Sequence, residues 1–210
     1  MVVILDNGHG ESTPGKRSPE GMLCNPGQTA LFEYEFNRNI VCRLKPLLEA
    51  SGIEYYELVP EVQDIALSVR ARKANQFYAN NPDSFLVSIH ANAFKPNTGT
   101  GWEAFAWQNP SNAYINENSA ILADTFYQAA ADHFGDEFRI RTGAPQLFKT
   151  ANFKIQRETQ MPSVLTENFF MDHEKDLAFI ISDKGRQRIA QMHHDAIKQY
   201  IQKRALIDLT

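Results

Sequence analysis

The sequence predicts a single α/β domain in which most strands run parallel to one another. Short apolar runs bounded by turn residues alternate with longer segments in which apolar residues recur at helical spacing, and this alternation is typical of α/β folds. The chain of 210 residues is long enough for one large core. It contains no internal repeat and no low-complexity linker, so we expect one domain over residues 1–210.

The first expected strand is followed by a long loop. Val2–Asp6 is an apolar run that ends at an acidic residue, which is typical of a short buried strand. The segment from Gly10 to Gly27 is rich in Gly, Pro and Ser. Connections of this length are uncommon in compact domains unless they form part of a functional site, so this loop is a candidate for one.

Helices and further strands follow in turn. A helix is expected over Thr29–Ala50 because several apolar side chains share one of its faces: Phe36, Ile40, Leu44, Leu47 and Leu48. We expect Pro46 to kink this helix and Ser51-Gly52 to end it. A second helix is expected from a cap at Asp64 to about Tyr78. The same criteria predict strands over residues 53–58, 85–89, 101–107 and 162–170, and helices over residues 120–134 and 184–203.

Charge and composition exclude several classes of function. Lys and Arg number 21 against 25 Asp and Glu, so we expect no nucleic-acid partner. The sequence has no apolar stretch of ~20 residues, and it lacks the basic start and apolar segment of a secretory signal. We therefore expect no transmembrane segment and no signal peptide. The protein is expected to be a monomer. The two cysteines, Cys24 and Cys42, are too few for a disulfide framework and are expected to be free thiols.

Three expected strands lead into residues that can carry chemistry. His9, His90 and Glu167 each stand at the carboxyl end of one of them, and Glu33 lies in the first turns of the helix after the long loop. Functional sites of open α/β sheets form outside the carboxyl ends of the strands. If these strands are parallel neighbours, two imidazoles and two carboxylates meet in one cleft.

That set of side chains fits a hydrolytic zinc site. Catalytic zinc takes three protein ligands of the His and Glu type and keeps one position for water, and a further carboxylate can act as general base. A single His after a strand is more often a structural hydrogen-bonding residue, and the spacing of all four residues by itself leaves both interpretations open. The remaining histidines, on expected helices or an acidic loop, are given no chemical role: His133, His173, His193 and His194.

Five motifs resemble those of one enzyme family. In chain order they are "LDNGHG", "EYEFN", "LSVRARKAN", "SIHANA" and "TQMPSVLTENFF", which together span Leu5 to Phe170. Each is similar to a motif of the zinc-dependent N-acetylmuramoyl-L-alanine amidases of the amidase-3 type, and the order is that of the family. The chain departs from the family pattern at Asn7, at Asn168 and in "FFMDH", all beside the expected site.

The resemblance implies a complete set of roles. Zinc would be held by His9, Glu33 and His90, with Glu167 as the catalytic carboxylate. The fold would be a twisted, mostly parallel sheet with helices on both faces. The substrate would be peptidoglycan, cleaved at the amide between the lactyl group of N-acetylmuramic acid and L-alanine. Glu35 lies two residues from Glu33 and thus about 200° around the helix, so only one of them can reach the metal.

Other interpretations remain open at this point. A zinc carboxypeptidase acting on stem peptides shares the same ligands but needs an arginine for the terminal carboxylate. An inactive cell-wall-binding module is the alternative from a different class. The long loop either forms a wall of the groove, with Lys16 and Arg17 facing peptide carboxylates, or is a mobile surface segment. Without an export signal, the expected role is that of an endolysin-like phage lysin; the sequence leaves localisation open.

Overall fold

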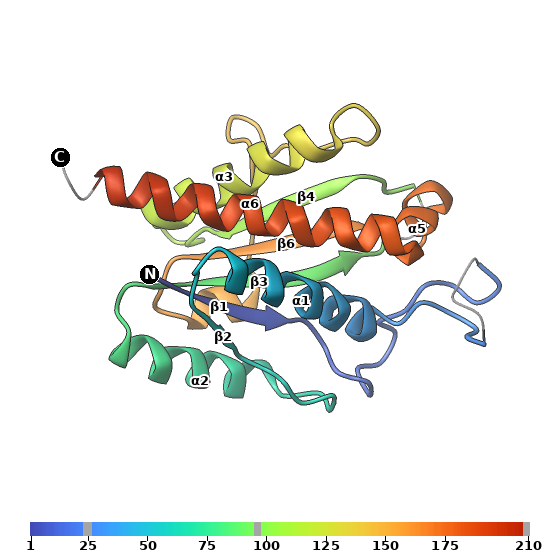
Figure 1. Ribbon diagram of the computed structural model, residues 1–210, viewed down its shortest axis with the longest axis horizontal. Coiled ribbons are helices and arrows are strands. Elements are labelled where there is room, and N and C mark those ends of the chain that lie inside the picture. The colour runs from blue at the N-terminus through green and yellow to red at the C-terminus, as the bar shows by residue number, and fades with distance from the viewer. Residues whose placement is uncertain (23–26, 95–97, 208–210) are drawn as a thin grey trace.

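Six strands form one sheet in the order β2-β1-β3-β6-β4-β5 in the computed structural model, which describes residues 1–22, 27–94 and 98–207 (Figure 1). Strands β2, β1, β3 and β6 run parallel to one another, β4 is antiparallel to β6, and β5 is parallel to β4. The predicted α/β fold with a mostly parallel sheet is confirmed. The strands are β1 (Val2–Asn7), β2 (Tyr55–Glu57), β3 (Ser84–Asn92), β4 (Trp102–Trp107), β5 (Lys149–Ala151) and β6 (Ser163–Phe170).

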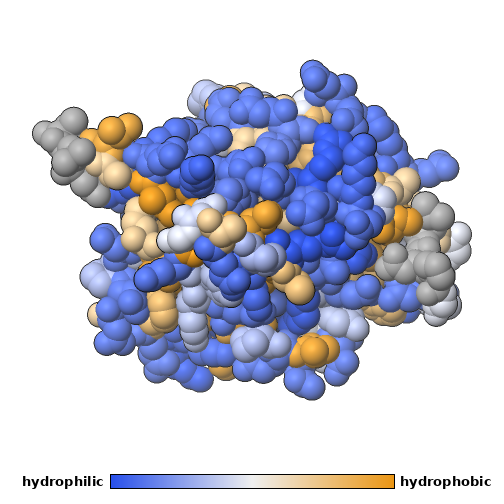
Figure 2. Space-filling view, viewed as in Figure 1, coloured by the Kyte–Doolittle hydropathy of each residue, from blue (hydrophilic) through white to orange (hydrophobic). Residues whose placement is uncertain are grey.

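Helices cover both faces of this sheet. One face carries α1 (Glu33–Ala50), α3 (Glu117–Phe134), α5 (Glu174–Ile181) and α6 (Asp183–Ile207), and the other carries α2 (Leu67–Asn80) and α4 (Lys154–Glu158). Figure 1 shows α6 crossing the sheet between α1 and α3. The outer surface of this helical layer is mainly hydrophilic in Figure 2. Among the described helices, none is long and apolar enough to cross a membrane.

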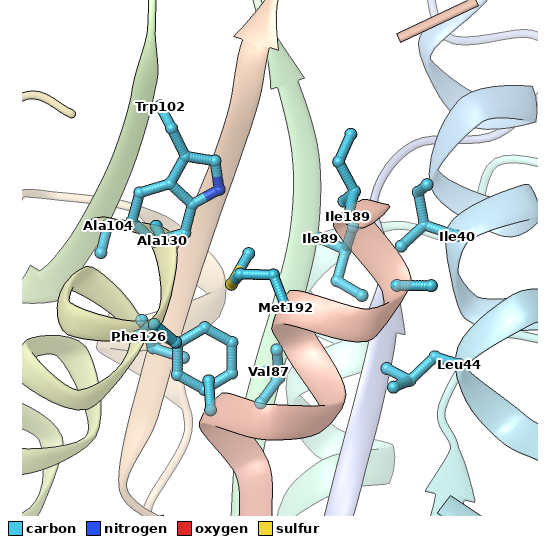
Figure 3. Packing of buried hydrophobic residues seen from close by; sticks show 14 of the residues in the cluster. Ile40, Leu44, Val87, Ile89, Trp102, Ala104, Phe126, Ala130, Ile189 and Met192 are labelled. Atoms are coloured by element: carbon cyan, nitrogen blue, oxygen red, sulfur yellow. The ribbon is translucent and has the colours of Figure 1, made fainter. Parts of the chain in front are cut away.

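The larger core lies between the sheet and the layer of α1, α3 and α6. Figure 3 shows side chains from these helices meeting those of β3 and β4, with the small Ala104 and Ala130 beside the Trp102 indole. Burying each large apolar side chain contributes about 1.5–3 kcal/mol, so this layer anchors the central strands. The indole N–H of Trp102 donates to Asn168 Oδ1 at 2.9 Å, which satisfies its polar group inside the core.

The first long helix begins later than predicted. Its first residue is Glu33 rather than Thr29, because residues 29–30 form a bend and Phe32 is extended, with Ala30 and Leu31 buried. Leu31 pairs through its backbone with Ser18, and Phe32 forms an isolated bridge with Arg17. The helix contains Pro46. It ends at Ala50, with Ser51 as its C-cap and Gly52 at a φ of 66°, so the expected end at Ser51-Gly52 is confirmed. This late start puts the Glu33 carboxylate in the first turn of α1.

Two further expectations need correction, and three short elements were not predicted. Asp64 does not cap α2: Ala66 is the N-cap, and Asp64 Oδ1 lies 3.6 Å from Arg70 Nη2 instead. The strand expected over residues 53–58 contains only Tyr55–Glu57. The elements β5, α4 and α5 were missed because segments of 3, 5 and 8 residues are too short to show a clear periodicity. Cys42 is a free, exposed thiol, and Cys24 lies outside the described residues.

A buried ion pair joins α2 to the end of β1. The guanidinium of Arg70, 1% exposed, donates to Asp6 Oδ1 at 2.8 Å and to the carbonyl oxygens of Asn7 at 2.9 Å and His9 at 3.0 Å. The second oxygen of Asp6 accepts from Ser88 Oγ at 2.7 Å on β3. Both buried charges are therefore paired and hydrogen-bonded, which is the condition under which such a pair is tolerated.

We expect Arg70→Ala to lower the free energy of unfolding by about 3–5 kcal/mol, because it leaves the Asp6 carboxylate buried without its partner. Urea unfolding followed by circular dichroism measures this loss. The matched control is Arg72→Ala on the exposed side of the same helix, expected within about 0.5 kcal/mol of the parent protein. Equal stability of the two variants would contradict the assigned role of Arg70.

Candidate metal centre

The sheet topology brings the predicted residues to one edge. Strands β1, β3 and β6 are parallel neighbours, with Asn7 paired to Ile89 and His90 paired to Glu167. The chain leaving β1 therefore places His9 next to His90, and their ring centroids lie 4.9 Å apart at an interplanar angle of 84°. The expectation that these strands are parallel neighbours, with His9, His90 and Glu167 at one edge of the sheet, agrees with this geometry.

Glu33 completes a compact set of three donors. Its Oε1 lies 2.9 Å from His90 Nδ1 and 3.3 Å from His9 Nε2. One ligand atom from each of these residues lies within 4.8 Å of the other two. The Glu33 side chain is 2% exposed, and its Oε2 has no hydrogen-bond partner among the described residues. A buried carboxylate oxygen without a hydrogen bond, beside two imidazoles, fits the donor set of a zinc ion.

The backbone around His9 explains the two flanking glycines. A Cβ at Gly8 would stand 2.1 Å from His90 Cε1, and one at Gly10 would stand 2.2 Å from the Asp64 backbone nitrogen. Both positions therefore exclude any side chain. The left-handed turn itself is made by His9, whose φ is 63°. The two glycines therefore provide space for close approach, while His9 itself makes the turn.

Three donors hold this strained turn in place. Asn37 Nδ2 donates to the Gly8 carbonyl oxygen at 3.0 Å, and Arg38 Nη1 and Arg70 Nη2 both donate to the His9 carbonyl oxygen at 3.0 Å. Asn37 follows Glu33 by about one helical turn. The Glu-x-x-x-Asn spacing therefore places a candidate metal ligand and the donor to the Gly8 carbonyl oxygen on one face of α1. The sequence analysis missed both arginines. For Arg70, the available signal was its place beside Ala71 and Ala74 on the buried side of α2.

Glu35 faces away from the two histidines. Its Oε2 accepts from Gln28 Nε2 at 2.7 Å, and its Oε1 lies 4.0 Å from Arg186 Nη1. The expectation that only one of these acids on α1 can reach the centre therefore agrees with the geometry, and the acid that does so is Glu33.

Electrostatics favour an ionised Glu33 between the imidazoles. Burial alone would raise the pKa of Glu33, but hydrogen bonds to His9 and His90 hold it well below the ordinary range of a carboxyl group. Burial lowers the pKa of His9, and Glu33 opposes this only in part. Burial also acts to lower the pKa of His90, but Glu33 outweighs it and the pKa is raised. Metal binding needs an ionised carboxylate and neutral imidazoles, and Glu33 and His9 meet this requirement.

Glu167 lies beside the three donors but is not one of them. It stands opposite His90 across the β3–β6 pair, and its Oε2 is buried without a hydrogen-bond partner in the described part of the chain. Burial raises the pKa of Glu167 to about 8, partly opposed by the nearby His90. Glu33 and Glu167 line one hollow of about 490 Å³, and Lys16 and Arg17 of the long loop also line it. The loop thus borders the candidate site, which agrees with the expectation that it forms a wall of the groove.

The four other histidines contact protein groups away from this cluster. His193 is fully buried, its Nε2 lies 3.0 Å from Thr166 Oγ1, and burial lowers its pKa to about 4. His173 is the N-cap of α5. His133 and His194 lie on α3 and α6, each with a ring nitrogen 2.9 Å from an oxygen of Asp195. In the described residues, the grouping of His9, Glu33 and His90 is the one that could hold a metal ion.

Comparison with known proteins matches this chain to one family. The Amidase_3 family model, described as N-acetylmuramoyl-L-alanine amidase, matches residues 3–199. The sporulation-specific N-acetylmuramoyl-L-alanine amidase of Bacillus subtilis is 27% identical over 95% of this chain and 68% of its own length. The endolysin of Bacillus phage SPP1 is 30% identical over 95% of this chain and 66% of its own length. The chain thus spans about two thirds of these relatives, and 35% of another, LytC of Bacillus subtilis.

Solved structures agree with the fold. An N-acetylmuramoyl-L-alanine amidase from Clostridium difficile 630 has a TM-score of 0.74 and 26% identity, with 96% of each chain covered. An N-acetylmuramyl-L-alanine amidase from Mycobacterium smegmatis has a TM-score of 0.76 and 23% identity, with 97% of each chain covered. At such low identity the second likeness concerns the fold alone.

The geometry predicts different metal contents for two variants of α1. Glu33→Ala removes a carboxylate from the three-donor set and is expected to lose zinc, whereas Glu35→Ala is expected to keep about one zinc per chain. Elemental analysis after dialysis against trace zinc measures both. Zinc retained by Glu33→Ala and lost by Glu35→Ala would reverse the assignment.

Proposed function

The chain belongs to the N-acetylmuramoyl-L-alanine amidase family, and on that premise we propose that it is a zinc-dependent hydrolase of the bond between the lactyl group of N-acetylmuramic acid and L-alanine. Membership makes it a hydrolase that acts on peptidoglycan. The observation that carries the zinc proposal is the set of three converging donors beside a fourth, separate carboxylate. This is the inventory that a hydrolytic zinc site needs.

His9, Glu33 and His90 would hold the metal. A zinc ion bound there would supply a water of lowered pKa and polarise the scissile carbonyl group. Arg38 and Arg70 keep His9 in position through its carbonyl oxygen, and Gly8 leaves room for the ring of His90. The protein's own contribution at this point is rigid placement of the ligands.

Glu167 is proposed to move the proton. Its carboxylate accepts a proton from the attacking water and donates it to the departing alanine nitrogen. In the metal-free protein burial favours the neutral form of Glu167, as its raised pKa indicates. A cation on the neighbouring ligands favours the ionised form, which brings the group toward the protonation state that a general base needs near neutral pH.

The alternatives have less support. The family match favours an amidase over a zinc carboxypeptidase. Against an inactive wall-binding module, all four residues are present: His9, Glu33 and His90 converge, and Glu33 and Glu167 line one hollow. The monomeric state and the role as a phage-type lysin stay predictions, with relatives that include both a sporulation-specific amidase and a phage endolysin.

Digestion of purified peptidoglycan tests the proposed bond. Mass analysis is expected to find whole stem peptides with a free alanine amino terminus and intact glycan strands. A chelator is expected to abolish the reaction, and added zinc to restore it. Release of single amino acids would indicate a carboxypeptidase, and activity that resists the chelator would contradict zinc dependence.

Glu167→Gln separates proton transfer from metal binding. The amide keeps the size of the side chain but cannot take a proton, so activity is expected to fall roughly 10²–10⁴-fold. Zinc content and thermal stability are expected to match those of the parent protein. If the variant lost zinc, Glu167 would be a ligand; if it kept full activity, the mechanism would be wrong.

A further inference from the structure

A second hollow adjoins the candidate metal centre on the other side of Glu167. It has a volume of about 230 Å³, and Phe94, Glu103, Arg141, Lys149 and Phe170 are among its lining residues. Asn92 borders both this hollow and the one that contains Glu33 and Glu167, so the two adjoin. The mechanism described above uses none of the charged groups in this second hollow.

The sheet register places the second hollow one strand beyond Glu167. His90 on β3 is paired with Glu167 on β6, and Glu167 is paired in turn with Glu103 on β4. Residues directly opposite one another on neighbouring strands point to the same face of the sheet, and neighbouring strands lie about 4.8 Å apart. His90, Glu167 and Glu103 therefore form a row, with Glu103 on the far side of Glu167 from the metal ligands.

Two cations share the single carboxylate of Glu103. Arg141 Nε and Lys149 Nζ both donate to its Oε1, and Asn92 Nδ2 donates to its Oε2 at 2.8 Å. The side chain of Glu103 is 3% exposed, whereas both cations are 25% exposed. One positive charge thus remains uncompensated within this group. A partly desolvated excess of positive charge in a hollow is a binding site for an anion.

Both cations are held in fixed positions before any ligand arrives. The guanidinium carbon of Arg141 lies 5.7 Å from the ring centroid of Phe170, and Lys149 Nζ lies 5.8 Å from that of Phe105. In the larger hollow, Arg17 is already paired with Glu20 at 2.9 Å, and Lys16 is 47% exposed and 3.8 Å from Glu33 Oε2. Arg141 and Lys149 are therefore the better organised anion site.

We propose that Arg141 and Lys149, positioned by Glu103, form a subsite for a carboxylate of the peptide that leaves from the scissile amide. The inference rests on the proposed amidase function, in which Glu167 faces the alanine nitrogen. An extended peptide advances at most about 3.3–3.6 Å per residue. A site one strand beyond Glu167 thus suits a carboxylate one or two residues after that nitrogen. The fork of Arg141 matches the planar shape of a carboxylate.

The test compares two soluble substrates: a muramoyl tripeptide with free carboxylates and the same compound with them amidated. The parent protein is expected to favour the free acid roughly 10-fold in kcat/KM, the scale of one charge-assisted contact at a partly exposed site. Arg141→Gln and Lys149→Met are each expected to bring this ratio toward one, through a higher KM for the free acid. Each variant leaves Glu103 one cation, so the fold is retained; zinc content and thermal midpoint check this.

Two controls locate the effect. Arg43→Gln removes an exposed ion pair with Asp183 on the helical layer and is expected to leave the ratio unchanged. Lys16→Met is expected to keep most of the preference. Loss of the preference in Lys16→Met but not in Arg141→Gln would overturn the subsite, as would equal losses on both substrates in Arg141→Gln and Lys149→Met. Equal cleavage of both by the parent protein contradicts the subsite alone, whereas cleavage of neither contradicts the proposed function and the subsite with it.

Discussion

The buried guanidinium of Arg70 is the contact on which the candidate metal centre depends. It satisfies Asp6 and two carbonyl oxygens where the chain leaves β1, and thereby fixes the left-handed turn at His9. A non-glycine residue in that conformation costs of order 1–3 kcal/mol and persists only where its surroundings over-determine it. Arg38 and Asn37 of α1 add two further contacts to the same turn. Hydrogen bonds from both α1 and α2 thus offset the strain of the turn at His9.

The same turn determines how closely the candidate metal ligands can approach one another. The ring of His90 occupies the space that a side chain at Gly8 would fill. Glu33 begins α1, so its carboxylate enters between the imidazoles without a preceding helical turn in the way. A three-donor site therefore arises from one strained turn, one late helix start and one glycine. None of these features would suffice alone.

Charge across the sheet edge follows the order of the strands. The candidate metal ligands His9 and His90 lie around β1 and β3, and Glu167, which is proposed to move the proton, lies on β6. Glu103 with its two cations lies on β4. Because β4 is antiparallel to β6, its first residues lie at the edge where β6 delivers Glu167. Glu103 therefore joins the row formed by His90 and Glu167. Proton transfer and charge recognition can therefore occupy neighbouring strands of one rigid sheet, which suits a substrate that extends across the strand ends.

The sequence alone determined the fold class and most of the long elements. It also singled out four polar residues that the fold brings to one edge of the sheet, His9, Glu33, His90 and Glu167. Apolar periodicity and the residues at strand ends are local signals, and they survive into the fold because burial favours the same pattern. Only the tertiary structure decided the late start of α1, the hydrogen bonds of Arg70 to the end of β1, and the pairing of Glu103 with both Arg141 and Lys149. Those contacts join residues 64, 38 and 46 positions apart for Arg70–Asp6, Arg141–Glu103 and Lys149–Glu103. No local pattern reports which distant charge will neutralise a buried one, because strand order and helix packing set that choice.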